Sequence, residues 1–443
     1  MTASLTTLPA NQFAERRARL MQALGGGAII LTAGHDQARN NDVDHEFRQQ
    51  STFWYLTGFD EPDAVAVLRP GSDQPYALFV RPFDARFEIW VGFRVGVDGA
   101  KERLGADLAF SIEQLDEELP KLLAEAETVH YSLGSDAKVD KLINDLIAQR
   151  RAAAQRGSLP LLSIMEPRPA IDHMRLIKSA DEIELLQQAI NITGPGFEAA
   201  LRTTTPGVYE FEVQSAMEAQ FRRLGSPRNG YPSIVASGAN ACILHYIKNR
   251  ARLNPGDLLL IDAGAEWEFY TADVTRTWPV SGQFTPEQRA VYEIVLEAQR
   301  QAIDAVAPGV GIDQAHQVAL KVLVQGLVDL GVLTGNVDGL IEDKAYSPYY
   351  MHGTSHWLGL DVHDAGVYRQ GDTPTELRAG MVLTVEPGLY FGTQAPNSPE
   401  HLKGIGIRIE DDVLVTANGR RVLTAAIPKS VADMESMVGT AQG

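Results

Sequence analysis

Two ten-residue segments share a layout that ends in a carboxylate. Residues 255–264 read PGDLLLIDAG and residues 379–388 read AGMVLTVEPG, so Asp262 and Glu386 occupy matching positions. An acidic side chain at the inner end of an apolar strand is costly to bury unless it is paired or binds a cation. Because this feature occurs twice at the same offset, we expect two halves that contribute carboxylates to one shared site.

Further acidic residues follow each segment. If residues 266–269 form the turn of a hairpin, Asp273 lies opposite Asp262, and like charges opposite each other destabilise a sheet unless a cation binds both. In the second half, a return strand ends in Glu410. Asp and Glu are depleted from apolar strand patterns, which weakens the explanation by chance. The sequence therefore predicts four carboxylates at one centre.

Four of the ten histidines lie in related places. His245 precedes the strand of the first segment, and His352, His356 and His363 lie within twelve residues ahead of the second. An oxygen-rich set with one or two imidazoles suits Mn, Fe or Co, and Zn less clearly. More than three carboxylates in one cavity can hold two ions about 3.5–4 Å apart, which activate a shared water and polarise a carbonyl. The set therefore favours hydrolysis.

Composition narrows the class of protein. The 443 residues exceed one ordinary core and predict two or three domains, and a formal charge of −18 argues against nucleic acid and anionic membrane surfaces as partners. Cys242 is the single cysteine, which excludes an internal disulfide and suits a reducing cytoplasm. We expect Cys242 to be a small buried thiol rather than a nucleophile. The first 24 residues lack the pattern of a signal peptide, and no apolar run is long enough to span a bilayer.

The chain divides into an N-terminal part and a duplicated part. Residues 1–172 read as mixed α/β, with these expected elements: a buried strand at 27–32, a hairpin of 64–68 with 76–80, helices near 113–126 and 138–154, and a linker at 150–168. After a capping box at Ser179, each half repeats the order helix, Pro-Gly-Val, helix, histidine, apolar strand with a terminal carboxylate. Residues 180–280 and 284–415 therefore read as diverged copies that form a pseudo-twofold domain.

The ordered motifs resemble the metal-dependent peptidases of the pita-bread fold, and most closely the bacterial Xaa-Pro aminopeptidases (aminopeptidase P). The segments that carry the resemblance are 261–277, 351–364, 385–390 and 406–411, with 47–49, 53–59 and 88–90 in the N-terminal part. The resemblance implies an α+β chain. A mixed α/β domain (1–172), for substrate access and oligomerisation, would precede a pita-bread catalytic domain (173–443) whose antiparallel curved sheet is flanked by helices.

The resemblance also implies the site residues. Five metal ligands for two divalent ions, most often Mn²⁺, would be Asp262, Asp273, His356, Glu386 and Glu410. His245, His352 and His363 match histidines that bind substrate and handle protons, and Arg408 matches an arginine that orients ligands. A bridging hydroxide would attack the carbonyl before proline, His363 would help to stabilise the oxyanion, and Glu386 would carry the proton to the leaving nitrogen.

The implied substrates are peptides with proline in second position. Trp90, Tyr231 and Tyr390 would form walls for the proline ring, with Trp90 supplied by a neighbouring subunit of a homo-oligomer, a dimer or a tetramer. A prolidase, which cleaves Xaa-Pro dipeptides with the same metals, is the nearest alternative, and Ser355-His356-Trp357 favours the aminopeptidase. Methionine aminopeptidases usually lack so long an N-terminal domain. Family members that have lost their metals act as binding modules, but in this sequence all five ligand positions carry a residue that can bind metal.

Overall fold

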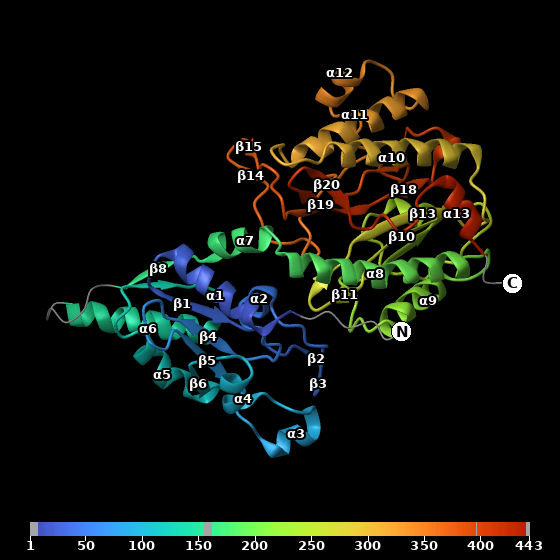
Figure 1. The fold of residues 1–443 in the computed structure, drawn as a ribbon. Helices are drawn as coiled ribbons and strands as arrows, with labels where there is room; N and C mark the ends of the chain where they lie inside the picture. The colour runs from blue at the N-terminus through green and yellow to red at the C-terminus, as the bar shows by residue number, and fades with distance from the viewer. Residues whose placement is uncertain (1–7, 155–161, 396, 440–443) are drawn as a thin grey trace. The chain divides into compact units, whose positions relative to one another are not determined.

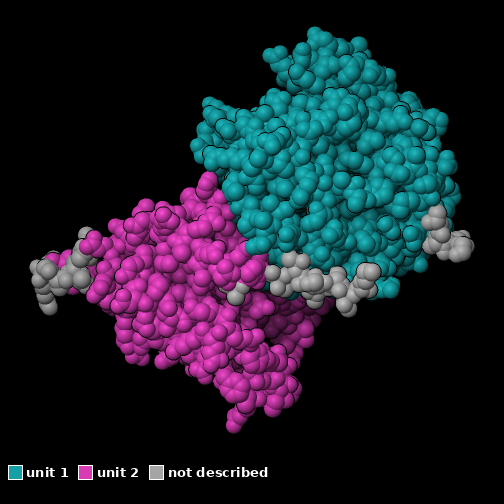
Figure 2. Space-filling model, viewed as in Figure 1, with its two compact units in different colours: residues 1–7, 175–443 teal, residues 8–174 magenta. Residues whose placement is uncertain are grey.

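The computed structural model describes residues 8–154, 162–395 and 397–439 and divides the chain into two compact units, Leu8–Met174 and Arg175–Gly443 (Figure 2). None of the described helices is both long and apolar enough to cross a membrane.

The N-terminal unit is built on a mixed six-stranded sheet in the order β6-β5-β4-β1-β7-β8. Its central strand is fully buried, as the apolar run predicted, and pairs antiparallel with β4 and parallel with β7. The predicted hairpin is present as β4 and β5. The strands are β1 (Ala28–Thr32), β2 (Ala38–Asn40), β3 (Val43–Asp44), β4 (Val65–Leu68), β5 (Tyr76–Val80), β6 (Leu108–Ser111), β7 (Thr128–His130) and β8 (Ser163–Met165). The helices are α1 (Ala10–Leu24), α2 (Ser51–Thr57), α3 (Ala85–Val91), α4 (Gly96–Glu102), α5 (Leu115–Leu122), α6 (Ala137–Ala154) and α7 (Arg168–Leu176).

The predicted linker at 150–168 is wrong at both of its ends. Arg150 still belongs to α6 and is buried, where its Nη2 donates to the carbonyl of Leu123 at 2.5 Å and that of Ala124 at 2.9 Å. At the other end β8 pairs with β7 at the edge of the sheet. The Arg- and Ala-rich composition is typical of a linker, but Arg150 binds carbonyls of the segment that directly follows α5. Residues 155–161 lie outside the described residues.

The C-terminal unit contains the duplicated segment. Its helices are α8 (Ala180–Thr203), α9 (Glu210–Arg223), α10 (Pro286–Asp304), α11 (Asp313–Asp329), α12 (Val337–Glu342) and α13 (Val431–Met437). Its strands are β9 (Ile234–Ser237), β10 (Leu258–Ala263), β11 (Glu266–Trp267), β12 (Tyr270–Thr271), β13 (Val274–Pro279), β14 (Arg369–Gln370), β15 (Thr373–Pro374), β16 (Val382–Val385), β17 (Gly388–Tyr390), β18 (Gly406–Arg408), β19 (Asp411–Thr416) and β20 (Gly419–Val422).

The two halves of this unit share the order of their main elements. Each half begins with a helix that a capping box starts, at Ser179 in α8 and at Thr285 in α10. Each then has a second helix and an antiparallel strand pair, β10 with β13 and β16 with β19. Glycines at matching turns, Gly256 and Gly380, share a positive φ of 87° and 91°. Figure 1 shows α8 and α9 on one side of these strands and α10 and α11 on the other.

The register of the first strand pair differs from the prediction. Asp262 pairs with Thr275, not with Asp273, because the hairpin closes through a two-residue turn rather than a four-residue one. Glu268 and Phe269 form that turn with φ of 46° and 66°, the left-handed values of a tight β-hairpin turn. Thr275 and Asp273 point to the same face because they lie two residues apart, so Asp273 is a diagonal neighbour of Asp262.

Candidate metal centre

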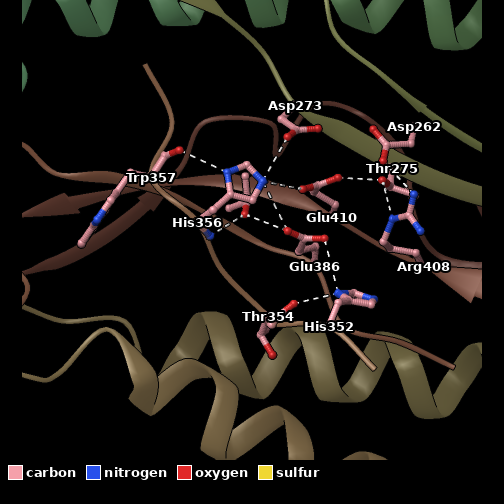
Figure 3. A network of polar contacts seen from close by, with 12 residues as sticks. Asp262, Asp273, Thr275, His352, Thr354, His356, Trp357, Glu386, Arg408 and Glu410 are labelled. Carbon is pink, nitrogen blue, oxygen red and sulfur yellow. Dashed lines mark hydrogen bonds and ion pairs between the residues drawn. The ribbon is translucent and has the colours of Figure 1, made fainter. Parts of the chain in front are cut away.

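The four predicted carboxylates come from the ends of the two central strand pairs. Asp262 is the next-to-last residue of β10 and Asp273 immediately precedes β13, while Glu386 follows β16 and Glu410 precedes β19. The close-up in Figure 3 shows Asp273, Glu386 and Glu410 around His356, with Asp262 next to Arg408. The structure therefore brings together acids that are far apart in the sequence.

His356 lies at the centre of the cluster. Its Nε2 is 3.3 Å from Asp273 Oδ2, 3.3 Å from Glu386 Oε1 and 4.0 Å from Glu410 Oε1. Asp273, His356 and Glu410 each offer a ligand atom within 4.8 Å of the others. The other ring nitrogen, Nδ1, is 3.1 Å from the carbonyl of Trp357, an arrangement in which Nδ1–H donates and Nε2 is left as the ligand atom.

The electrostatics of the cluster fit a cation. Burial raises the pKa of Asp262, raises that of Glu386 to about 7, and raises that of Glu410 well above its ordinary value, with the neighbouring carboxylates adding to each shift. Burial lowers the pKa of His356, but Asp273 and Glu386 outweigh it and raise the value to about 9. If all four carboxylates are ionised, they repel each other. A divalent ion bound among them would remove that repulsion.

Arg408 forms an ion pair with Asp262, one of the four carboxylates. Its Nη2 donates to Asp262 Oδ2 at 2.7 Å, its Nη1 to the hydroxyl of Tyr390 at 3.1 Å, and its Nε to Thr275 Oγ1 at 3.2 Å. In the part of the chain that the structure describes, this is the one Arg or Lys that forms an ion pair with any of the four carboxylates. One guanidinium leaves most of their charge uncompensated, so the residues present fit divalent metal.

The three other predicted histidines lie around the same cavity. His352 is held between the Tyr390 hydroxyl, 2.8 Å from Nε2, and the carbonyl of Gly353, 2.7 Å from Nδ1; burial lowers its pKa to about 3, so it is neutral at physiological pH. The ring of His363 lies 4.4 Å from that of His356, and both His245 and His363 are exposed. The cavity has a volume of about 560 Å³, and the apolar side chains of its wall include Ile234, Leu244, Ile247 and Val362.

The predicted wall residues have different surroundings. The hydroxyl of Tyr231 is 2.6 Å from Asp262 Oδ1 and 2.5 Å from Asp273 Oδ1, and that of Tyr390 lies between His352 and Arg408. Both hydroxyls therefore hold site residues in place, which the sequence did not indicate. Trp90 belongs to α3 of the N-terminal unit and is 85% exposed, so its part in the site stays a prediction.

Comparisons with known proteins agree with this geometry. The description "Metallopeptidase family M24" matches residues 184–417, and "Aminopeptidase P, N-terminal domain" matches residues 13–131. The Xaa-Pro aminopeptidase of Haemophilus influenzae is 44% identical and covers 98% of this chain and 99% of its own length. This chain belongs to the aminopeptidase P family. The Escherichia coli Xaa-Pro aminopeptidase is 40% identical, with coverage of 99% of this chain and 100% of its own.

This chain also shares the fold of solved aminopeptidase P structures. The structure of Pseudomonas aeruginosa aminopeptidase PepP matches with a TM-score of 0.95 and 43% identity, over 99% of this chain and 100% of that one. The predicted fold class and the prediction of a metal-dependent Xaa-Pro aminopeptidase are confirmed. The prolidase alternative is not favoured, because the matched relatives named here are Xaa-Pro aminopeptidases.

Several residues that support the carboxylates of the site were not predicted from the sequence. Asp412 is fully buried, and its Oδ2 accepts the backbone N–H of Asp273 at 3.1 Å. Thr275 Oγ1 donates to Glu410 Oε2 at 2.6 Å, and Thr384 Oγ1 contacts Glu386 Oε1 at 3.3 Å. The signal was present, since residues 410–412 are three consecutive acids ahead of an apolar strand. Asp411 is accounted for by Arg276 and Lys429, to which it is bonded, and Asp412 turns toward the site.

Proposed function

We propose that this chain removes the N-terminal residue from peptides that carry proline in second position. The observation that supports this most is the partly buried imidazole of His356, which lies among carboxylates and lines an open cavity in a member of the aminopeptidase P family. A peptide bond before proline is a tertiary amide without an N–H, so the site needs no acceptor for that group. Apolar side chains in the cavity wall suit a substrate with a pyrrolidine ring.

We further propose that the site holds two divalent ions and that these are Mn²⁺. The proposed ligands are Asp262, Asp273, His356, Glu386 and Glu410, a set of carboxylates with one imidazole that suits a hard or borderline ion. All five side chains would hold the ions, and Asp273, His356 and Glu410 already offer ligand atoms within 4.8 Å of one another. When bound, such a pair supplies an activated water and polarises the scissile carbonyl.

The chain's own groups would orient the substrate and move protons. Arg408 fixes Asp262, and neutral His352 fixes the Tyr390 hydroxyl beside the cavity. His245 and His363 are exposed toward substrate, where a ring N–H can donate to the carbonyl oxygen that becomes negative. The carboxylate of Glu386, which lines the cavity 3.3 Å from His356 Nε2, would take a proton and deliver it to the leaving proline nitrogen.

We also propose that the chain forms a homo-oligomer, either a dimer or a tetramer. Around α3 the apolar side chains of Phe87, Ile89, Trp90, Val91 and Phe93 are all more than half exposed. Contiguous apolar surface of this kind marks interaction sites. Trp90→Ser should shift the mass measured by light scattering toward the monomer, and an unchanged mass would argue against this surface as the interface. A cytoplasmic location stays a prediction that rests on the single cysteine.

The test compares two substrates and several metals. Chelated protein reloaded with Mn²⁺, Co²⁺ or Zn²⁺ is assayed on an Xaa-Pro dipeptide and on an Xaa-Pro-Xaa tripeptide, with Asp273→Asn as the inactive control. We expect tripeptide turnover that returns with Mn²⁺. Turnover of the dipeptide alone would point to a prolidase, and full activity of the Asp273→Asn variant would refute the metal assignment.

A further inference from the structure

Glu210, the first residue of α9, is a fully buried carboxylate outside the metal centre. Its Oε1 accepts from the Ser237 backbone N–H at 2.8 Å, Ser237 Oγ at 2.7 Å and Asn240 Nδ2 at 3.1 Å. Its Oε2 accepts from the Tyr246 hydroxyl at 2.9 Å and the Ala251 backbone N–H at 2.8 Å. Five donors therefore converge on one side chain, and all of them come from residues 237–251.

Residues 238–251 belong to the connection between β9 and β10, which carries His245. Apart from one short 3-10 helix, Gly238–Cys242, the connection has no regular structure to hold its shape. Its two ends and its middle are instead tied to Glu210. Leu244, His245 and Ile247 of this connection line the cavity above the metal centre.

Tyr246 is the direct link between Glu210 and His245. Its ring packs against the apolar cluster of Ile234, Ala236, Ala241 and Leu260, and its hydroxyl reaches Glu210. The side chain of residue 246 is thus fixed inward while the adjacent side chain, that of His245, is exposed at the cavity. Removing the anchor would free the backbone that sets the direction of the imidazole.

We infer that Glu210 is a positioning residue for His245 in the cleavage of Xaa-Pro peptides. A carboxylate suits this place because five donors need an acceptor-only group, and its location in the first turn of α9 lets the helix dipole favour the negative charge. Glutamine would place an amide NH₂ against a backbone N–H on either side, that of Ser237 or that of Ala251, and would break at least one contact. The inference rests on the proposed function, in which His245 contacts substrate.

A double-mutant cycle tests whether Glu210 acts through His245. Glu210→Gln should lower kcat/KM on an Xaa-Pro-Xaa tripeptide by about 100-fold, the loss typical of a group displaced by about 1 Å. In a His245→Ala background the same substitution should cost less than about threefold, because the group that it positions is gone. Equal factors in the two backgrounds, or loss of bound metal in Glu210→Gln, would overturn the inference.

Two further variants separate positioning from general damage. Tyr246→Phe removes one hydroxyl and should lower kcat/KM by about tenfold at unchanged metal content, whereas Glu212→Gln makes the same charge change in the same helix turn at an exposed site, away from the connection, and should leave activity intact. Hydrogen exchange gives a readout independent of turnover. Glu210→Gln should speed exchange in residues 238–251 and leave β13 unchanged, and exchange that rises equally in both would refute positioning even if the native chain proved not to be an aminopeptidase.

Discussion

Reloading metal into chelated protein should release protons, in a number that follows from the site. At pH 7 the metal-free protein carries nearly a full proton on His356, whose pKa is about 9 because Asp273 and Glu386 outweigh burial. Glu386 carries about half a proton, since burial raises its pKa to about 7. A ligand imidazole must offer Nε2 as a lone pair and a ligand carboxyl group must be ionised, so both protons leave on binding.

These two groups predict the release of about 1.5 protons per chain at pH 7, and Glu410, whose pKa burial raises further, adds to that number. Metal affinity should then rise about 30-fold per pH unit near neutrality, because the slope of log affinity against pH equals the number of protons released. The stability of the metal-free protein changes in the opposite direction. A carboxyl group with a raised pKa stabilises the fold below its ordinary value of 4.5, and this contribution is lost as the pH rises through about 7.

Isothermal titration of Mn²⁺ in two buffers of different ionisation enthalpy measures the released protons directly. His356→Gln serves as the matched control and should lower the count by less than one proton, because loss of the imidazolium also raises the pKa of Glu386. Thermal melts of chelated protein should show Tm falling from pH 5 to pH 8 and the gain on adding Mn²⁺ growing across that range. A proton count near zero at pH 7 would mean that His356 is already neutral and the carboxyl groups already ionised, which would refute the electrostatic account of the site.

Three shorter predictions follow from single residues. Asp273→Asn should remove activity and at least one metal ion per chain, as measured by turnover and elemental analysis. Gly264→Ala should destabilise the protein by about 3 kcal/mol in denaturant melts, because a Cβ there would lie 1.7 Å from the carbonyl oxygen of Ala272, whereas Gly194→Ala within α8 meets only ordinary contacts and should be neutral or stabilising. Cys242→Ala should keep its activity, since burial raises the pKa of the Cys242 thiol to about 11 and leaves it unreactive toward iodoacetamide at pH 8.

Elements with a strong local signal could be predicted from the sequence. The apolar run of β1, the capping box at Ser179 and the two Pro-Gly-Val turns all code for their structure within a few residues, and the structure has them where the patterns indicated. The linker at 150–168 was wrong for the opposite reason. What holds Arg150 is a set of carbonyls more than twenty residues away, which no local pattern records.

The site shows the same division. Acids within apolar strands were recognisable, because such residues are expensive to bury and therefore need a reason. The strand partner of Asp262 could not be recognised, because it depends on whether two or four residues close the hairpin. Glu268 and Phe269 form the two-residue turn, although such residues seldom adopt left-handed backbone conformations. The contacts of the Tyr231 and Tyr390 hydroxyls could not be predicted either, because the direction in which a hydroxyl points depends on tertiary packing.

The contacts behind the carboxylates cross from one half of the duplication to the other. Arg408 of the second half binds Asp262 of the first, and Thr275 of the first half donates to Glu410 of the second. The backbone N–H of Asp273 is bonded to Asp412, again across the halves. Neither half alone could satisfy its own acids, so each copy without the other would bury unpaired charge. The metal centre and the docking of the two halves therefore depend on the same contacts, and this explains why a cluster of acids so unfavourable by itself can be held together at the middle of the fold.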